Sequence, residues 1–256
     1  MIAAFLHRMS QGNLYRRRTE SRNPTEPTQG AHMANTPNPP ISWYEEALHR
    51  EQHEDVRETG FREVLAVLRE CQPQRWLDFG CSAGALIQQG ADIGEGYGFD
   101  NDEVAVKLGK DRGLRVTSDW DEVPRVEFIT AIDVVEHMTV DDLITWMQRW
   151  YERLTDEGGR VLIVTANPAN VTAMSTFWDD WQHQRPYGPN CLIGLQATVG
   201  FETERLIFRQ QRTLHKPLFR LVRKALMAIG LWPDPGNDFA SYMLLLRKVP
   251  AGGAHD

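Results

Sequence analysis

The sequence predicts an α/β fold in which a mostly parallel sheet carries helices on both faces. From residue 61 to residue 165, short apolar runs alternate with stretches of helical periodicity. Residues 76–84, Trp-Leu-Asp-Phe-Gly-Cys-Ser-Ala-Gly, form an apolar strand that breaks into a turn of small residues, and Asp100 ends the next strand. In open α/β sheets, such a turn and such a carboxylate together bind a nucleoside over the carboxyl ends of the strands.

The elements of the first half follow from periodicity. Apolar residues recur every three or four positions in residues 43–47 and 61–68, which predicts helices there. After them we expect strands near 75–79, 96–100, 114–118 and 127–133, and helices near 83–90 and 102–110. This order is that of βαβ units and a parallel sheet.

The second half begins with a marked helix start. Thr139 and Asp142 have the spacing of a capping box, and one apolar stripe follows, made of Leu143, Trp146, Met147, Trp150 and Leu154. Gly158 and Gly159 are expected to stop this helix. The β-rich run 160–165 is typical of a strand covered on both faces. A helix near 189–199 and strands near 201–209 and 241–246 then bring the expected strands to seven.

Composition bounds the class of protein. The chain has 256 residues, of which 41% are hydrophobic and 25% charged, as in a globular domain. Its net charge of −7 argues against a nucleic-acid partner. Three scattered cysteines, Cys71, Cys81 and Cys191, do not make a disulfide framework or a zinc site, and no run reaches the roughly 18 apolar residues of a membrane span. We therefore expect a cytoplasmic protein.

Four stretches in order resemble the class I S-adenosylmethionine-dependent methyltransferases. They are residues 76–84, the strand end Gly98-Phe-Asp100, Asp-Val-Val-Glu-His-Met at 133–138, and Glu-Gly-Gly-Arg-Val-Leu-Ile-Val-Thr-Ala-Asn-Pro at 157–168. The last two resemble the branch of quinone, natural-product and saccharide O-methyltransferases. The first departs from the family pattern at Ser82 and Ala83, where Gly and another residue are commoner.

The resemblance implies a Rossmann-like sheet of seven strands whose last strand is antiparallel and inserted between the fifth and sixth. It covers a methyltransferase domain over 43–248, with a lid segment at 168–199 on the acceptor side and a helical insertion at about 210–236. Residues 1–42, rich in Arg and Pro, are expected to be a disordered leader, with a transit peptide at 7–22 as the alternative, and 249–256 a flexible tail. Translation starts at Met1 or Met33.

The resemblance also implies S-adenosylmethionine as cofactor. Asp100 takes the ribose hydroxyls with Asn101 beside it, Asp119 accepts from the adenine amine and Trp120 covers the ring. The full expected set is Asp78, Gly80, Ser82, Gly84, Asp100, Asn101, Asp119, Trp120 and Asp133. The structural alternatives are a generic tight turn for the glycines, a helix N-cap for Asp100 and a surface turn for Asp119.

The residues favour this cofactor over a nicotinamide dinucleotide. The second glycine of the dinucleotide fingerprint lets backbone approach the pyrophosphate, and Ser82 would place a side chain there. A sulfonium cofactor has no phosphates, so its turn tolerates Ser82. Asp78 lies where a carboxylate attracts the positive end of that cofactor, and the helix N-terminus after Gly84 favours its carboxylate.

Methyl transfer to a hydroxyl benefits from a general base, and His137 and His183 are the candidates. A structural hydrogen bond, or a metal next to Glu136, is the alternative for His137, and we assign no metal ligands. In the lid segment, Trp178, Trp181 and Tyr187 are expected to line an acceptor pocket or to pack on one another. Arg185 is expected to hold an anionic acceptor or to pair with a nearby aspartate.

A basic run interleaved with apolar residues occupies 205–227, which suits either peripheral membrane contact or a solvated helix face. The sequence as a whole predicts a methyltransferase, acting on oxygen of a small molecule, a saccharide or a quinone-like ring. The alternatives are a catalytically silent binding or scaffold protein of the same fold and, third, an NAD-dependent oxidoreductase. Oligomeric state stays open.

Overall fold

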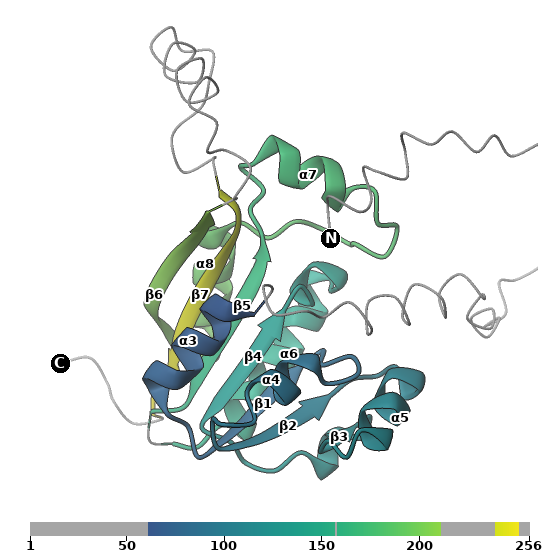
Figure 1. Cartoon of the computed structure of the whole chain (residues 1–256). Coiled ribbons are helices and arrows are strands. Elements are labelled where there is room, and N and C mark those ends of the chain that lie inside the picture. Colours follow the sequence, from purple (N-terminus) through teal and green to yellow (C-terminus); the bar gives the residue numbers. More distant parts are fainter. Residues whose placement is uncertain (1–60, 157, 211–238, 251–256) are drawn as a thin grey trace, which may run out of the picture. The chain divides into compact units, whose positions relative to one another are not determined.

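The computed structural model describes residues 61–156, 158–210 and 239–250 (Figure 1). The expected leader, most of the insertion at 210–236 and the end of the tail lie outside these residues. The domain limits therefore stay predictions.

Seven strands form one sheet in the order β3-β2-β1-β4-β5-β7-β6. Their bounds are β1 Arg75–Phe79, β2 Glu95–Phe99, β3 Val116–Thr117, β4 Phe128–Ile132, β5 Arg160–Ala166, β6 Phe201–Gln210 and β7 Phe239–Lys248. The pairs from β3 to β5 are parallel, and β7 is antiparallel to both β5 and β6. The expected topology, with the last strand inserted between the fifth and sixth, is confirmed.

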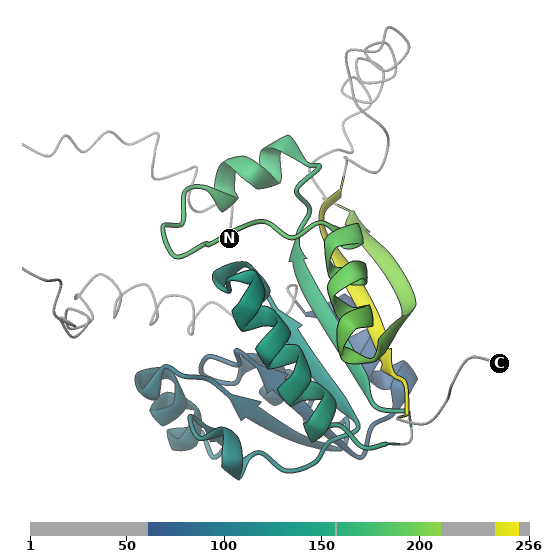
Figure 2. The ribbon, with the colours of Figure 1, turned by 180° about the vertical axis from the view of Figure 1, so that it is seen from behind.

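Helices cover both faces of the sheet. On one face lie α3 (Arg62–Cys71), α4 (Ala85–Gln89) and α5 (Glu103–Asp111), and on the other α6 (Val140–Arg153) and α8 (Pro189–Val199) (Figures 1 and 2). Each strand contributes side chains to the cores on both faces, because successive side chains along a strand point to opposite faces of the sheet. In β5, Val161 and Ile163 belong to the core under α6 and α8, whereas Leu162 and Val164 belong to the core under α3 and α4. The prediction that this strand is covered on both faces is confirmed.

The start of α6 follows the sequence, but its end does not. Thr139 and Asp142 form the predicted capping box. The helix stops at Arg153, before Gly158 and Gly159, because fully buried Leu154 takes an extended backbone and forms a bridge with Val126. A tertiary contact therefore ends the helix where the sequence has no stop signal, and the predicted stop at the two glycines was wrong. The left-handed Gly158 (φ 70°) instead lies in the turn into β5.

The lid segment contains one helix that periodicity did not indicate, α7 (Val171–Phe177). The Asn170 side chain caps it by accepting from the Ala173 N–H. Between α7 and α8 the chain has no regular element, and this stretch carries the expected acceptor residues. Among the described helices, none combines the length and the apolar character needed to cross a bilayer.

Part of the basic run is also described. Arg205 and Arg209 on β6 form ion pairs with Glu70 and Glu63 of α3, at 2.5 and 3.0 Å. These two arginines therefore join the outer strand to α3. The rest of the run, from residue 211, lies outside the described residues, so contact with a membrane stays a prediction.

Candidate active site

The turn after β1 requires unusual backbone geometry. Gly80, Ser82 and Gly84 all have left-handed φ values, 77°, 49° and 79°. A Cβ on Gly80 would lie 2.8 Å from a methyl carbon of Val134, so only glycine permits this close approach to the chain after β4. The N–H groups of Gly80 and Cys81 donate to the carbonyl of Phe99, which fastens the turn to the end of β2.

Asp100 stabilises the strained residue of this turn. Its Oδ2 accepts from the Ser82 N–H at 2.7 Å and its Oδ1 from the Asp102 N–H at 2.9 Å. Each carboxylate oxygen has two acceptor positions, so each keeps one for a ligand hydroxyl. The N-cap of α5 is Asp102, which accepts from the N–H groups of Val104 and Ala105. The cap alternative for Asp100 was therefore wrong.

Asp78, at the same end of β1, is a buried carboxyl group with 5% of its surface exposed. Thr130 of β4 donates its hydroxyl to Oδ1 at 2.7 Å. Burial raises the pKa of Asp78 to about 7, while the Thr130 hydrogen bond opposes the shift and the nearby Asp100 adds to it. A cation bound here would favour the ionised form.

On the expected adenine side, Asp119 is exposed and its carboxylate accepts from the Asp121 N–H. The ring of Trp120 packs edge-on against Phe99 at 5.3 Å, and the Arg153 guanidinium lies over it at 5.2 Å. The adenine contacts of Asp119 and Trp120, and a role for exposed Asn101, stay predictions.

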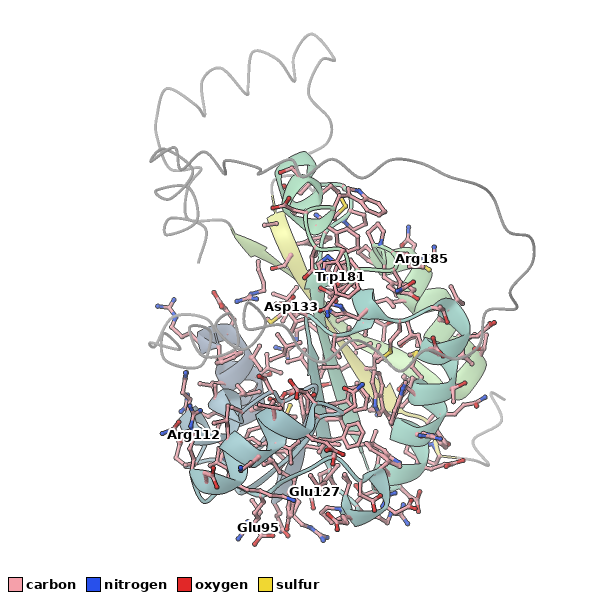
Figure 3. The ribbon with its side chains drawn as sticks, turned by 90° about the vertical axis from the view of Figure 1, so that its right-hand side faces the viewer. Glu95, Arg112, Glu127, Asp133, Trp181 and Arg185 are labelled. Carbon is pink, nitrogen blue, oxygen red and sulfur yellow. The ribbon has the colours of Figure 1, made fainter. Side chains whose placement is uncertain are left out.

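The acceptor side begins where β4 ends. Asp133 has a left-handed φ of 49°, and its N–H donates to Val164 of β5. Figure 3 shows Asp133, Trp181 and Arg185 toward one end of the sheet, and Glu95 and Glu127 at the other. We call residues 133–138 the β4 turn. Since Val134 contacts Gly80, the β4 turn borders the expected cofactor turn.

Glu136 connects the β4 turn to the lid segment. Its side chain is buried and accepts from the Thr165 hydroxyl at 2.9 Å. Burial, and then the neighbouring Asp133, raise the pKa of Glu136 to about 8. Its main-chain carbonyl accepts from the N–H groups of Gln184 and Arg185.

These hydrogen bonds bring the two predicted histidines together. The ring centroids of His137 and His183 are 4.6 Å apart. His183 stacks on Phe177 at 4.4 Å, and its Nδ1 lies 2.7 Å from the Phe177 carbonyl oxygen. Burial, followed by the proximity of His183, lowers the pKa of His137. The site therefore holds two adjacent imidazoles, one in the β4 turn and one in the lid segment.

The aromatic residues of the lid segment separate into two kinds. Tyr187 is fully buried. Its hydroxyl donates to the Met138 carbonyl, and the main-chain carbonyl of Tyr187 accepts from the Tyr242 hydroxyl. Trp178 and Trp181 are 64% and 81% exposed. The Arg185 guanidinium lies over the Tyr187 ring at 5.1 Å. Tyr187 thus has a structural role, and contact of any of these residues with an acceptor stays a prediction.

Several residues of the site had no clear signal in the sequence. Thr130 is the polar residue within the apolar run of β4, which reads equally well as ordinary β-propensity. Thr165 and Tyr242 likewise become recognisable only through their partners. In the described part of the chain, His, Cys, Asp and Glu form no group of three that could hold a metal ion.

Comparison with known proteins places this geometry in a family. The model of the methyltransferase domain matches residues 49–197. No curated protein matches the sequence.

Solved structures share the fold. An S-adenosylmethionine-dependent methyltransferase from Archaeoglobus fulgidus is 18% identical, with a TM-score of 0.59, over 78% of this chain and 99% of that one. Magnesium protoporphyrin IX methyltransferase from Synechocystis PCC 6803 was solved with S-adenosylmethionine (14% identity, TM-score 0.50, 86% of both chains). The same enzyme was solved with S-adenosylhomocysteine (13% identity, TM-score 0.52, 86% of this chain and 90% of that one). The chain belongs to the methyltransferase-domain family, and the predicted enzyme class and its cofactor, S-adenosylmethionine, are confirmed.

Proposed function

We propose that the protein transfers a methyl group from S-adenosylmethionine to an oxygen atom of a small molecule, with a saccharide or a quinone-like ring as the favoured acceptor. The observation that carries this proposal is the adjacent pair of imidazoles, His137 and His183, because a neutral imidazole is the base best matched to a hydroxyl near neutral pH. The cofactor, when bound, supplies a methyl group activated by a sulfonium.

The residues present fit that cofactor. Asp100 has free acceptor capacity for ribose hydroxyls, and buried Asp78 favours a cationic ligand. Gly80 and Gly84 supply the left-handed backbone of the turn that would lie against the ligand, and the Ser82 hydroxyl would contact its methionine portion. Adenine would lie by the remaining residues of the expected set, Asn101, Asp119 and Trp120.

On the acceptor side, His183 or His137 would take the proton that the acceptor loses. Asp133 would border both the cofactor and the acceptor, since it lies in the turn that contacts Gly80 through Val134. The exposed rings of Trp178 and Trp181 suit a sugar ring or an apolar group. Arg185 would meet an anionic acceptor.

The main rival is a binding protein of the same fold without turnover. The adjacent imidazoles argue against it, since binding of the cofactor alone requires no base. The NAD alternative is disfavoured by Ser82, whose side chain occupies the position that the dinucleotide turn keeps open. We further propose a cytoplasmic location, because all three cysteines are free thiols, as is usual in a reducing compartment.

Calorimetric titration with S-adenosylhomocysteine, with NAD in parallel, tests the proposed cofactor site. Micromolar binding of the sulfur nucleoside alone supports it. Binding of NAD, or of neither ligand, overturns it.

A further inference from the structure

The buried carboxyl group of Asp78 is held by one neighbouring side chain, that of Thr130 on β4. We infer that Thr130 is a positioning residue of the cofactor site: its hydroxyl holds one oxygen of Asp78 and leaves the other for the positive end of the cofactor. This inference rests on the proposed function, in which Asp78 meets the cationic part of S-adenosylmethionine. It deepens that function by naming the residue through which this contact is set.

The strand register leaves β4 as the source of a side-chain donor for Asp78. Asp78 pairs with Gly98 of β2 on one side and with Thr130 of β4 on the other. A Cβ on Gly98 would lie 2.6 Å from the Sγ of Cys81, so a side chain at this position would collide with the turn after β1. Thr130 is fully buried and donates its hydroxyl to Oδ1 of Asp78 at 2.7 Å. Valine there would have a similar shape but no donor.

The main chain of the turn after β1 does not supply a donor to Asp78 either. The N–H groups of Gly80 and Cys81 donate to the Phe99 carbonyl. The N–H of Ser82 donates to a different carboxylate. In the described part of the chain, Oδ2 of Asp78 therefore receives no hydrogen bond, although only 5% of the residue is exposed. Such an oxygen is costly to bury, and a ligand with N–H donors and a positive charge would satisfy it.

The Thr130 hydrogen bond also affects whether Asp78 is charged near neutral pH. Burial raises the pKa of Asp78 to about 7, while the Thr130 hydroxyl opposes the rise and the nearby Asp100 adds to it. Burial, and then Asp78, raise the pKa of the Cys81 thiol, which is therefore neutral here. A donor to a carboxylate favours the charged form. Without the Thr130 hydroxyl, Asp78 should ionise only at higher pH and should attract a cation only there.

A second pair of the same kind provides a matched control. Thr165 of β5 is also fully buried, and its hydroxyl donates to the Glu136 carboxyl group at 2.9 Å. That carboxyl group is buried as well, and its pKa is raised to about 8, mainly by burial. It belongs to the β4 turn, on the acceptor side. Loss of the Thr165 hydroxyl therefore disturbs a similar pair without disturbing Asp78.

The experiment measures binding of S-adenosylhomocysteine to the full chain by calorimetry from about pH 6 to about pH 9, the range in which we expect Asp78 to ionise. It compares the unmodified protein with Thr130→Val, Thr130→Ser and Thr165→Val. Valine removes the donor and keeps the branched shape, whereas serine keeps the donor and removes a methyl group. The amino group of the ligand titrates in the same way in every comparison, so differences in the pH profile come from the protein.

In the unmodified protein, the affinity should rise with pH through about 7. Thr130→Val should lower the affinity at pH 7 by roughly tenfold and move the midpoint of this rise to higher pH. Thr130→Ser should keep the midpoint, although the lost methyl group lowers the Tm. Thr165→Val should keep both the midpoint and the affinity.

Three results would each overturn the inference: an unchanged midpoint in Thr130→Val, an equal shift in Thr165→Val, or the same shift in Thr130→Ser. In each case the pH profile would not depend on the hydroxyl beside Asp78. Failure of the unmodified protein to bind S-adenosylhomocysteine would instead count against the proposed function.

Discussion

Replacing Asp78 by Asn should stabilise the protein at alkaline pH while weakening the cofactor site. The Asp78 carboxyl group is 5% exposed and has a pKa of about 7 in the folded chain, against 3.8 for the free side chain. The folded state therefore binds a proton more tightly than the unfolded state does. The stabilisation by this proton is fully present below pH 4 and is lost as the pH rises through 7.

The magnitude follows from the shift. A displacement of about three pKa units corresponds to roughly 4 kcal/mol of lost stability above pH 7, at about 1.4 kcal/mol per unit. Asn does not ionise, and its side-chain oxygen still accepts from the Thr130 hydroxyl. Its buried NH₂ group lacks a hydrogen-bond acceptor, which costs about 1–2 kcal/mol and offsets part of the gain in stability. A net gain of about 2 kcal/mol would raise the Tm of a domain of this size by roughly 4–8 °C.

Thermal unfolding of both proteins between about pH 5 and about pH 8 measures this effect, and calorimetry with S-adenosylhomocysteine measures binding. We expect the Tm advantage of Asp78→Asn to grow with pH, and its affinity to fall by about 1–3 kcal/mol through loss of a charged partner. Glu136→Gln is the matched control: its carboxyl group is also buried, with a pKa of about 8, so stability should respond similarly while binding is kept. A Tm difference for Asp78→Asn that does not change with pH would refute the reasoning.

Three further changes test the turn, the ribose site and a helix start. Asp100→Ala should weaken binding of S-adenosylhomocysteine by about 1–3 kcal/mol, and Asp102→Ala should lower only stability; equal affinities in calorimetry would exclude the ribose contact. Ser82→Gly should raise stability by about 1 kcal/mol, since glycine accepts a φ of 49° without strain, and a lower urea midpoint would contradict this. Thr139→Ala should cost about 1 kcal/mol through the lost cap of α6, and an unchanged urea midpoint would count against that role.

The sheet could be predicted because its signals are local. The apolar run of β5 and the capping box at Thr139 each depend on neighbouring residues, and both are confirmed. The end of α6 depends on the contact of Leu154 with Val126, which periodicity does not reveal. The antiparallel place of β7 came from family resemblance, since its apolar pattern is equally compatible with a parallel strand.

The site was predictable by residue type but not by arrangement. The sequence marks His137 and His183 as candidate bases, but their proximity depends on Glu136, whose carbonyl accepts from the N–H groups of Gln184 and Arg185. These are long-range contacts between irregular segments, where hydrophobic periodicity carries no information. For Tyr187 the sequence leaves open whether the ring lines an acceptor pocket or packs in the lid segment, and the structure shows that the ring is buried.

In the described part of the chain, two of the three non-glycine residues with left-handed backbones and two buried carboxyl groups lie at one end of the sheet. Ser82 and Asp133 hold left-handed backbones beside the glycine turn and the β4 turn, and Asp78 and Glu136 are buried carboxyl groups at the same end. Each destabilises the free protein, by about 1–3 kcal/mol for a strained backbone residue and by more for a desolvated carboxylate. A cationic ligand that neutralises Asp78 removes part of that destabilisation. We therefore expect bound S-adenosylmethionine to raise the Tm more than S-adenosylhomocysteine does at equal saturation, because only the sulfonium adds a positive charge.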